Sequence, residues 1–345
     1  MNEAPTVAVV IVNYRTPALA LRCLAALVPE RNALPSLRVI IVDGGSGDGS
    51  ADVLAAGIDN PDFHDWVTLL PLPINGGFGW ANNQAIITLL QSQSPPDFIH
   101  LLNPDTEIEP GAVAILSAIL DEHPRVAAVG SQLVEPDGRN SGSAFRFPSA
   151  GREFMRASRT PSLCALLGIK PTLIERETAG VAEWVTGASV MFRSDVLRSL
   201  GLFDDGFFLY FEEVELMHRI SRAGWEIWHA PASRVMHVGG AATGVNAVAT
   251  VKRALPEYCF TSRNRYFTLV HGTAAAARAT RAWLIGDMVW KLRCLFGLGR
   301  AGDDVPNERA MLKQSLATFR PSDVVKAEVN WTDRLGTTPA WMRSQ

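Results

Sequence analysis

The feature that most constrains the fold is a regular alternation of strand and helix patterns over the first 135 residues. Short runs rich in Val, Ile and Leu alternate with longer segments of helical periodicity. The predicted strands are residues 7–12, 39–42, 67–72 and 98–102, and the predicted helices are 17 to about 28, 79–90 and 110–122. Repeated β-α units of this length are typical of a mostly parallel sheet with helices on both faces. The expected fold class is therefore α/β, with a Rossmann-like central sheet.

Polar residues follow these strands at the points where each strand ends. Asn13, Asp43, Asn75 and Asp105 all lie just beyond a predicted strand. Ligands of open α/β sheets bind at the carboxyl ends of the strands. The sequence therefore predicts a binding site along one edge of the sheet.

Three carboxylates lie close together inside the apolar and aromatic segment 207–215. They are Glu212, Glu213 and Glu215. Burying carboxylates without partners is costly, so we expect them to face a cation or a proton that is transferred. Together with Asp105 and the later His237, they indicate a metal-dependent transferase that acts on an anionic substrate.

Composition limits the class of protein and its partners. With 345 residues, 19% of them charged and 47% hydrophobic, the chain is an ordinary globular protein, and its net charge of −3 predicts no nucleic-acid partner. The four cysteines show no CxxC spacing, which argues against a zinc site or a disulfide framework and favours a reducing cytosol. We expect no secretory leader and no transmembrane segment, because no apolar run reaches the roughly 20 residues that a span needs.

The later part of the chain is less regular and suggests a division into domains. Residues 140–180 mix polar residues with Arg, Pro and Gly, and we expect them to form an excursion over the site. Further strands are predicted over 185–192 and from 225 towards 237, and helices over 194–201, 212–223 and about 245–296. The predicted domains are 1–245, with a nucleotide-binding half (1–135) and an acceptor and catalytic half (136–245), then a basic helical extension (246–300) and a polar tail (301–345).

Seven segments in fixed order carry a resemblance to a known family. They are VIVNY (10–14), IVDGGSGDGS (41–50), NGGFGWANN (75–83), LNPDT (102–106), WVTGA (184–188), FLYFEEVEL (208–216) and HVGG (237–240). The chain resembles the inverting, metal-dependent glycosyltransferases of family 2, which have the GT-A fold, and most closely their bacterial rhamnosyltransferase-like branch. The ordered set covers about residues 7 to 245, whereas the last hundred residues match only loosely.

The resemblance implies a divalent metal at the LNPDT segment. Departure of a nucleoside diphosphate needs positive charge, which Mg²⁺ or Mn²⁺ supplies. Asp105 stands at the family's DxD-type position, and Asn103 replaces the first Asp, so it binds the metal, a metal-bound water or the ribose. His237 adds a third contact, to metal or to phosphate, and its nitrogen favours Mn²⁺. The alternatives are that Asp105 caps a turn and that His237 is a structural histidine.

The donor nucleotide is implied to lie against the ends of the first two strands. In the family an acid after the second strand pairs with the pyrimidine or its ribose, a role that falls on Asp43, while Asn13 and Tyr14 frame the nucleoside. Two further parts of the implied donor site have structural alternatives: Gly76 and Gly77 allow close backbone approach or make a turn, and Asn82 reaches the diphosphate or sugar or is purely structural.

Inversion requires a base that deprotonates the acceptor hydroxyl on the face opposite the leaving nucleotide. The family has this base second in a Glu-Asp pair, which here is Glu213, one methylene longer. Glu212 is implied to orient the acceptor, and Glu212 and Glu215 remain alternative bases. A solvated acidic helix start is the competing interpretation. Residues implied to complete the acceptor site are Trp184, Thr186 and Gly187.

The basic C-terminal region has two open interpretations. Residues 251–300 contain nine Lys or Arg against two acids, a balance of +7. Interleaved tryptophans favour an interfacial helix on the anionic inner face of the cytoplasmic membrane, and a packing or homodimer element is the alternative. Arg263 belongs to an aromatic and arginine-rich element implied to contact a diphosphate, of the donor or of a lipid-linked acceptor.

The sequence therefore favours an inverting glycosyltransferase that moves L-rhamnose from dTDP-L-rhamnose to a hydroxyl of a cell-surface glycan or a lipid-pyrophosphate-linked acceptor. We expect it in the cytoplasm, on the inner membrane face if the extension binds lipid. One alternative is the same fold with a UDP-hexose donor. The other is a non-catalytic nucleotide-sugar or glycan-binding protein, which the departures at Asn103 and Glu213 keep open.

Overall fold

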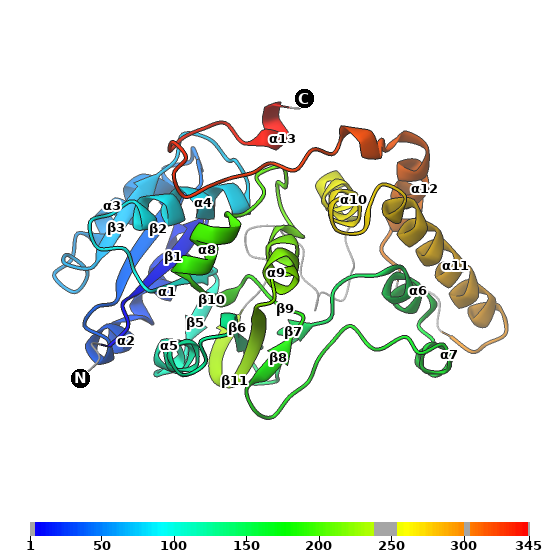
Figure 1. The fold of residues 1–345 in the computed structure, drawn as a ribbon, viewed down its shortest axis with the longest axis horizontal. Helices are drawn as coiled ribbons and strands as arrows, with labels where there is room; N and C mark the ends of the chain where they lie inside the picture. Colours follow the sequence, from blue (N-terminus) through cyan, green and yellow to red (C-terminus); the bar gives the residue numbers. More distant parts are fainter. Residues whose placement is uncertain (1–3, 238–253, 300–303, 344–345) are drawn as a thin grey trace.

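The fold is known from a computed structural model that describes residues 4–237, 254–299 and 304–343 (Figure 1). The predicted domain boundary at 245, the start of the helical extension and the last three residues of the HVGG segment lie outside the described residues. A broad sheet with its helices occupies one end of the molecule, and a group of helices from residue 150 onward occupies the other.

Nine strands of the described chain form a mixed sheet with the order β3-β2-β1-β4-β10-β6-β11-β5, with β8 paired to β11 beside this path. Their bounds are β1 Val7–Asn13, β2 Arg38–Asp43, β3 Val67–Pro71, β4 Phe98–Leu102, β5 Thr106–Ile108, β6 Val126–Val134, β8 Gly180–Ala182, β10 Ser189–Arg193 and β11 Glu226–His237. The four strands β3, β2, β1 and β4 are parallel neighbours, as predicted. β10 runs antiparallel to both β4 and β6, so the second half of the sheet is mixed.

The inner strands are buried on both faces, which explains their continuous apolar sequence. Successive side chains of a strand point to opposite faces, so Ala8 and Val10 enter one core and Val7, Val9 and Ile11 enter the other. One core is completed by α4 (Phe78–Leu90), α8 (Ser194–Leu200) and α9 (Glu212–Arg222). The other is completed by α1 (Pro17–Ala25), α3 (Ser50–Ile58) and α5 (Ala112–Glu122). The predicted arrangement of helices on both faces is thus confirmed.

Two predicted elements are divided in the structure. The helix expected from 17 to about 28 ends at Ala25, and a second helix, α2 (Val28–Ala33), follows. Pro29 lies at the start of α2, where a proline is tolerated, whereas inside one long helix its ring would clash with the preceding turn. The single strand expected over 185–192 is split into β9 (Trp184–Val185) and β10. The split falls at Gly187, and β9 pairs with β7 (Ala144–Phe145) in a separate small sheet.

Five helices of the described chain, all from residue 150 onward, form their own group beside the sheet (Figure 1). They are α6 (Ala150–Ser158), α7 (Pro161–Leu166), α10 (Glu257–His271), α11 (Ala275–Leu295) and α12 (Glu308–Thr318). α11 packs closely along α6: a β-carbon on Gly286 would lie 2.9 Å from the Ala157 side chain. Within the 140–180 excursion, α6 therefore packs against the C-terminal helix α11.

The tail returns across the molecule to the sheet end and finishes with the short α13 (Ala340–Arg343) (Figure 1). Trp331 packs against the core that contains α4. Along α4, Trp80 Nε1 donates to the Thr337 carbonyl (2.8 Å) and the Gly336 amide donates to Gln84 Oε1 (2.8 Å). A segment with little sequence pattern is thus fixed by specific contacts with α4.

Candidate functional site

The carboxyl edge of the sheet begins with a hydrogen-bonded pair from β1 and β2. The parallel register sets Asn13 opposite Asp43, and Asn13 Nδ2 donates to Asp43 Oδ1 at 2.8 Å. Ser46 adds its hydroxyl to the same oxygen (2.6 Å) and its amide to Oδ2 (3.1 Å). Asp43 is only 3% exposed, and these donors fix its carboxylate in one orientation. Two sequence-predicted donor residues are thus brought together.

A cation that the motifs did not indicate lies beside this pair. The Arg15 guanidinium lies over the Tyr14 ring, 5.1 Å from its centroid, and Arg15 Nε donates to the Ser46 carbonyl (3.1 Å). Arg15 is exposed and has a left-handed φ of 58°, a conformation that is uncommon outside glycine. A single arginine after a strand carries no spacing signal, so sequence reasoning missed this positive charge at the predicted nucleotide edge.

Asp105 and His237 are brought together by strand pairing. β5 begins directly after Asp105 and pairs antiparallel with the end of β11, which sets His237 opposite Thr106. His237 Nε2 lies 3.2 Å from Asp105 Oδ1. Asn103 lies two residues earlier in the same turn, where its backbone N–H donates to the Ala188 carbonyl (2.9 Å). Two of the three predicted metal ligands are therefore neighbours.

The donor set at this turn fits a divalent metal that also binds substrate phosphates. Within the described part of the chain, no group of three or more His, Cys, Asp or Glu side chains is gathered as a metal cluster. Mg²⁺ in phosphate-transfer sites typically takes one or two carboxylates and fills its other positions with phosphate and water oxygens. A carboxylate and an imidazole in contact match that pattern, and the nitrogen suits Mn²⁺.

α9 begins with the two carboxylates predicted to be catalytic. The preceding Tyr210 and Phe211 both have left-handed φ values, 69° and 70°, a strained conformation of the kind that persists at functional sites. Glu212 is 2% exposed, and Oε2 of both Glu212 and Glu213 is buried without a hydrogen-bond partner among the described residues. Burial raises the pKa of both carboxyls, and the charge of Glu213 raises the pKa of Glu212 further.

Glycines let other segments approach these carboxylates closely. A β-carbon on Gly187 would lie 3.7 Å from Glu213 Cβ and Cγ, and one on Gly79 would lie 3.4 Å from Glu212 Cγ. The predicted acceptor residue Gly187 is thus adjacent to the predicted base. Of its neighbours, Thr186 Oγ1 accepts from the Ala188 amide (3.3 Å), and Trp184 stacks on Phe145 at 4.5 Å between centroids.

The glycine-rich loop before α4 is fastened to the segment that leads into α9. The Phe78 amide donates to the Phe208 carbonyl (3.1 Å), and a β-carbon on Gly77 would collide with that carbonyl oxygen. Gly77 also has a φ of 92°, so only glycine satisfies both conditions. From the tail, Trp341 Nε1 donates to the Gly76 carbonyl (2.8 Å), and its ring lies edge-on to Phe208 with centroids 4.9 Å apart.

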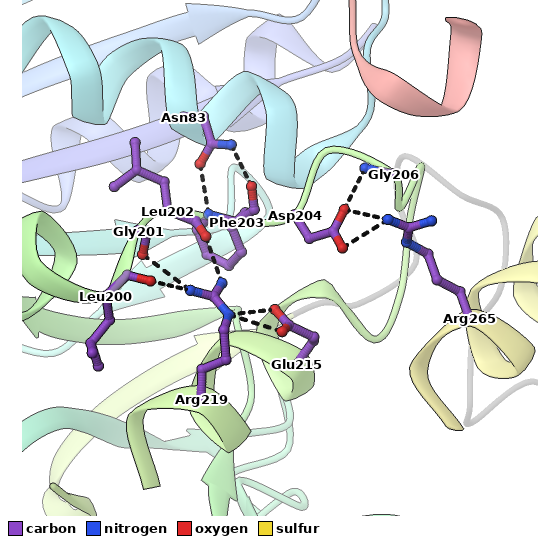
Figure 2. Close-up of polar contacts among 10 residues, drawn as sticks. All are labelled: Asn83, Leu200, Gly201, Leu202, Phe203, Asp204, Gly206, Glu215, Arg219 and Arg265. Carbon is purple, nitrogen blue, oxygen red and sulfur yellow. Dashed lines mark hydrogen bonds and ion pairs between the residues drawn. The ribbon is translucent and has the colours of Figure 1, made fainter. Parts of the chain in front are cut away.

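The polar residues behind the site are structural. Asn83 exchanges two hydrogen bonds with the backbone of Phe203, at 2.8 and 3.0 Å. Figure 2 shows how Glu215 receives both of its contacts from Arg219 Nε, 2.9 Å each, while Arg219 also donates to the carbonyls of Leu200, Gly201 and Leu202. These bonds fix the loop that leads towards the strained residues Tyr210 and Phe211.

Two predicted donor residues have structural partners. Asn82 is 1% exposed, and its Nδ2 donates to the Phe78 carbonyl one turn earlier (2.9 Å). Arg263 is 5% exposed, and its Nε and Nη2 both bind Glu153 Oε2, at 3.1 and 2.8 Å. This ion pair joins α10 to α6. Contact of Asn82 and Arg263 with the donor therefore remains a prediction. The internal hydrogen bonds of both side chains argue against it.

The sheet topology defines the class of the fold. The structure is similar to that of mannosyltransferase PcManGT from Pyrobaculum calidifontis in complex with GDP-Man and Mn²⁺, with a TM-score of 0.51 and 17% identity, over 92% of this chain and 77% of that one. It is also similar to GalNAc-T7 with UDP, GalNAc and Mn²⁺, with a TM-score of 0.55 and 14% identity, over 92% of this chain and 59% of the other. The fold is thus of the GT-A type, as predicted.

The family follows from the sequence. The model of the glycosyltransferase like family 2 matches residues 4–259, so the chain belongs to this family and is a glycosyltransferase. It is 30% identical over 218 residues to N-acetylglucosaminyl-diphospho-decaprenol L-rhamnosyltransferase of Mycobacterium tuberculosis, which covers 60% of this chain and 68% of the relative. It is 29% identical over 169 residues to rhamnosyltransferase WbbL of Escherichia coli K12, 47% of this chain and 60% of the relative. The resemblance inferred from the motifs is confirmed.

Proposed function

We propose that this glycosyltransferase moves L-rhamnose from dTDP-L-rhamnose to a hydroxyl of a diphosphate-lipid-linked glycan, with inversion at the anomeric carbon. The names of the two relatives support the sugar, and the name of the mycobacterial one supports the acceptor class. The observation that carries the catalytic part is the buried Oε2 of Glu213, which has no hydrogen-bond partner among the described residues and belongs to a side chain whose Cβ and Cγ lie against Gly187.

The donor nucleotide and its metal are bound by residues at the carboxyl edge of the sheet in this mechanism. Asn13 and Asp43 bind the pyrimidine nucleoside through their fixed amide and carboxylate. Asp105 and His237 would hold the divalent metal, which when bound would supply positive charge for the departing diphosphate. Asn103 lies in the same turn, and its side-chain amide oxygen would bind the metal, a water on the metal or the ribose.

Glu213 acts as the general base. Its Oε2 takes the proton of the acceptor hydroxyl while the acceptor oxygen forms a bond to the anomeric carbon and the bond to the nucleotide's diphosphate breaks. Glu212 lies beside it and orients the acceptor. A buried carboxyl with a raised pKa is a stronger base than an ordinary Glu once it is ionised, which suits this step.

The test is a donor panel with the full chain. We expect Mn²⁺- or Mg²⁺-dependent turnover of dTDP-L-rhamnose that exceeds that of UDP-galactose and UDP-glucose. Asp105→Ala should abolish metal-dependent binding of dTDP in calorimetry while the circular dichroism spectrum is unchanged, and Asn103→Ala should have a smaller effect because an amide is a weaker ligand.

Two results would overturn the proposal. Faster turnover of a UDP-hexose would replace the donor. Tight nucleotide-sugar binding with no hydrolysis or transfer of any donor would identify a binding protein instead of an enzyme of this specificity.

A further inference from the structure

A row of exposed apolar side chains runs along one side of α11. Ile285, Met288, Leu292 and Leu295 are 51%, 58%, 56% and 79% exposed. Their spacings of three and four residues set them on one face of the helix. Phe296 and Leu298 continue the row beyond the helix end, and both are more than 60% exposed. A contiguous apolar surface of this kind marks an interaction site.

The opposite side of α11 is already occupied. Ala279 and Trp283 are buried, and Gly286 lies so close to α6 that an added β-carbon would be 2.5 Å from the Phe154 carbonyl oxygen. The core contacts of this helix are therefore made by its other face, and the exposed row is not needed for packing within the described residues.

A second segment adds apolar side chains near the same end of the molecule. Leu166 and Leu167, at the end of α7, are 83% and 58% exposed. Arg159, two residues before α7, is tied to the last turns of α11. Arg293 Nη1 donates to the Arg159 carbonyl (2.8 Å), and the Arg159 guanidinium lies 4.5 Å from the Trp290 ring centroid. In Figure 1, α7 and the end of α11 lie at the side of the molecule away from β1–β3.

Basic residues continue the row towards the start of α11. Arg278 and Arg281 precede Ile285 at the same three- and four-residue spacing and are exposed. Neither forms an ion pair with a described residue. The row therefore has a positive half and an apolar half, and the exposed Lys170 follows the α7 leucines.

We propose that this surface, formed by the exposed row of α11 and the end of α7, binds an anionic lipid bilayer. Apolar side chains enter the boundary between headgroups and acyl chains, while basic residues meet lipid phosphates. A second copy of the chain fits less well: parallel α11 rows would oppose arginine to arginine, and fully overlapped antiparallel rows would oppose arginine to leucine. The inference is linked to the proposed function at one point, because a lipid-linked acceptor lies in such a bilayer.

The test is flotation of the full chain with vesicles of phosphatidylcholine alone or with 30% phosphatidylglycerol, chosen so that about a third of the lipid is anionic. We expect binding to the anionic vesicles at low salt that weakens as salt is added. Arg278→Gln with Arg281→Gln should lower partitioning roughly 25-fold, about fivefold per charge. Met288→Ser, Leu292→Ser and Leu295→Ser together should lower it at least about tenfold.

Matched controls separate this surface from folding and from catalysis. Val53→Ser with Val181→Ser removes exposed aliphatic side chains elsewhere and should leave flotation unchanged. All variants should keep the wild-type Tm and the wild-type rate of donor hydrolysis, which needs no lipid. Absence of flotation, or flotation that the α11 variants retain, would overturn the proposal while leaving the proposed function intact. A wild-type dimer that the serine variant converts to a monomer would assign the surface to a second copy.

Discussion

Glu215 and the pair Glu212–Glu213 are carboxylates at the start of α9 in opposite surroundings. Glu215 receives two bonds from Arg219, which also fixes the preceding loop (Figure 2). Glu212 and Glu213 each keep a buried oxygen that no described residue binds. Burial raises the pKa of all three, but only for Glu215 does a cation oppose that effect. The difference separates a carboxylate that is satisfied by a structural ion pair from two that keep an unsatisfied buried oxygen, which is what the proposed function requires of them.

The largest expected effect is on turnover at Glu213. Glu213→Gln keeps the size of the side chain but removes its basic oxygen, so we expect kcat to fall roughly 10²–10⁴-fold with donor affinity nearly unchanged. Glu213→Asp should retain substantial activity if the shorter carboxylate still reaches the acceptor. Steady-state kinetics and calorimetry with dTDP measure the two quantities.

The control for this prediction is Glu215→Gln, which should affect kcat much less. If Glu213→Gln is active and Glu212→Gln is inactive, the base is Glu212. The rate should also depend on pH: because burial raises the pKa of Glu213, kcat/KM should decline on acidification at a pH above the ordinary Glu value of about 4.3. A profile flat down to that value would contradict the assignment.

The next effect concerns stability at Glu215. Arg219→Met leaves a 4%-exposed side chain without its cation and removes the donors to three loop carbonyls. Breaking one partner of a buried ion pair costs about 3–5 kcal/mol of unfolding free energy. Urea denaturation should show this loss, and the double variant Glu215→Gln with Arg219→Met should be less affected. Equal loss in single and double variants would mean that the ion pair itself contributes nothing.

A smaller effect of opposite sign is expected at Glu212. Its folded-state pKa is raised, so the cost of burying its charge develops as pH rises above the unfolded-state value of about 4.3. Glu212→Gln should therefore increase Tm by about 1–3 °C at pH 8 and leave it unchanged near pH 4. Thermal scans at the two pH values measure this, and an increase that is the same at both would show that the charge is not its cause.

The smallest effect is expected at Trp341, which contacts Phe208 in the segment that leads into α9. Trp341→Phe keeps a ring against Phe208 but removes the hydrogen bond to the Gly76 carbonyl, so donor KM should rise about two- to tenfold with kcat unchanged. Met342→Ala, at the neighbouring position, is the matched control. A fall in kcat without a change in donor KM would mean that Trp341 positions Glu213 and not the glycine-rich loop.

Sequence reasoning succeeded where one local pattern decides the structure. The continuous apolar strands around Val9 and Ile41 and the polar residues at their ends predicted the parallel half of the sheet and the position of Asn13 and Asp43 along one edge of it. The helix start at Glu212 was also predicted to the residue. In these segments burial, periodicity and strand-end polarity all indicate the same answer.

It failed where distant pairing decides. β5 and β6 were not anticipated, since β5 has three residues and β6 contains Gly130 and Ser131 within its apolar run. The burial of Arg263 depends on Glu153, 110 positions earlier in the chain. The contact of Trp341 with Gly76 depends on a tail without periodicity. No local pattern encodes such partners, so they follow only from the folded structure.

The contact between Trp341 and Gly76 also has a consequence for how the protein is made. The two residues are 265 positions apart, and at about 5–20 residues per second a ribosome needs on the order of ten to fifty seconds to add the second after the first. Throughout that interval the nascent sheet domain lacks the last partner of its glycine-rich loop. The loop before α4 therefore gains this partner only after Trp341 has been synthesised, and a chain truncated before Trp341 lacks the hydrogen bond to the Gly76 carbonyl.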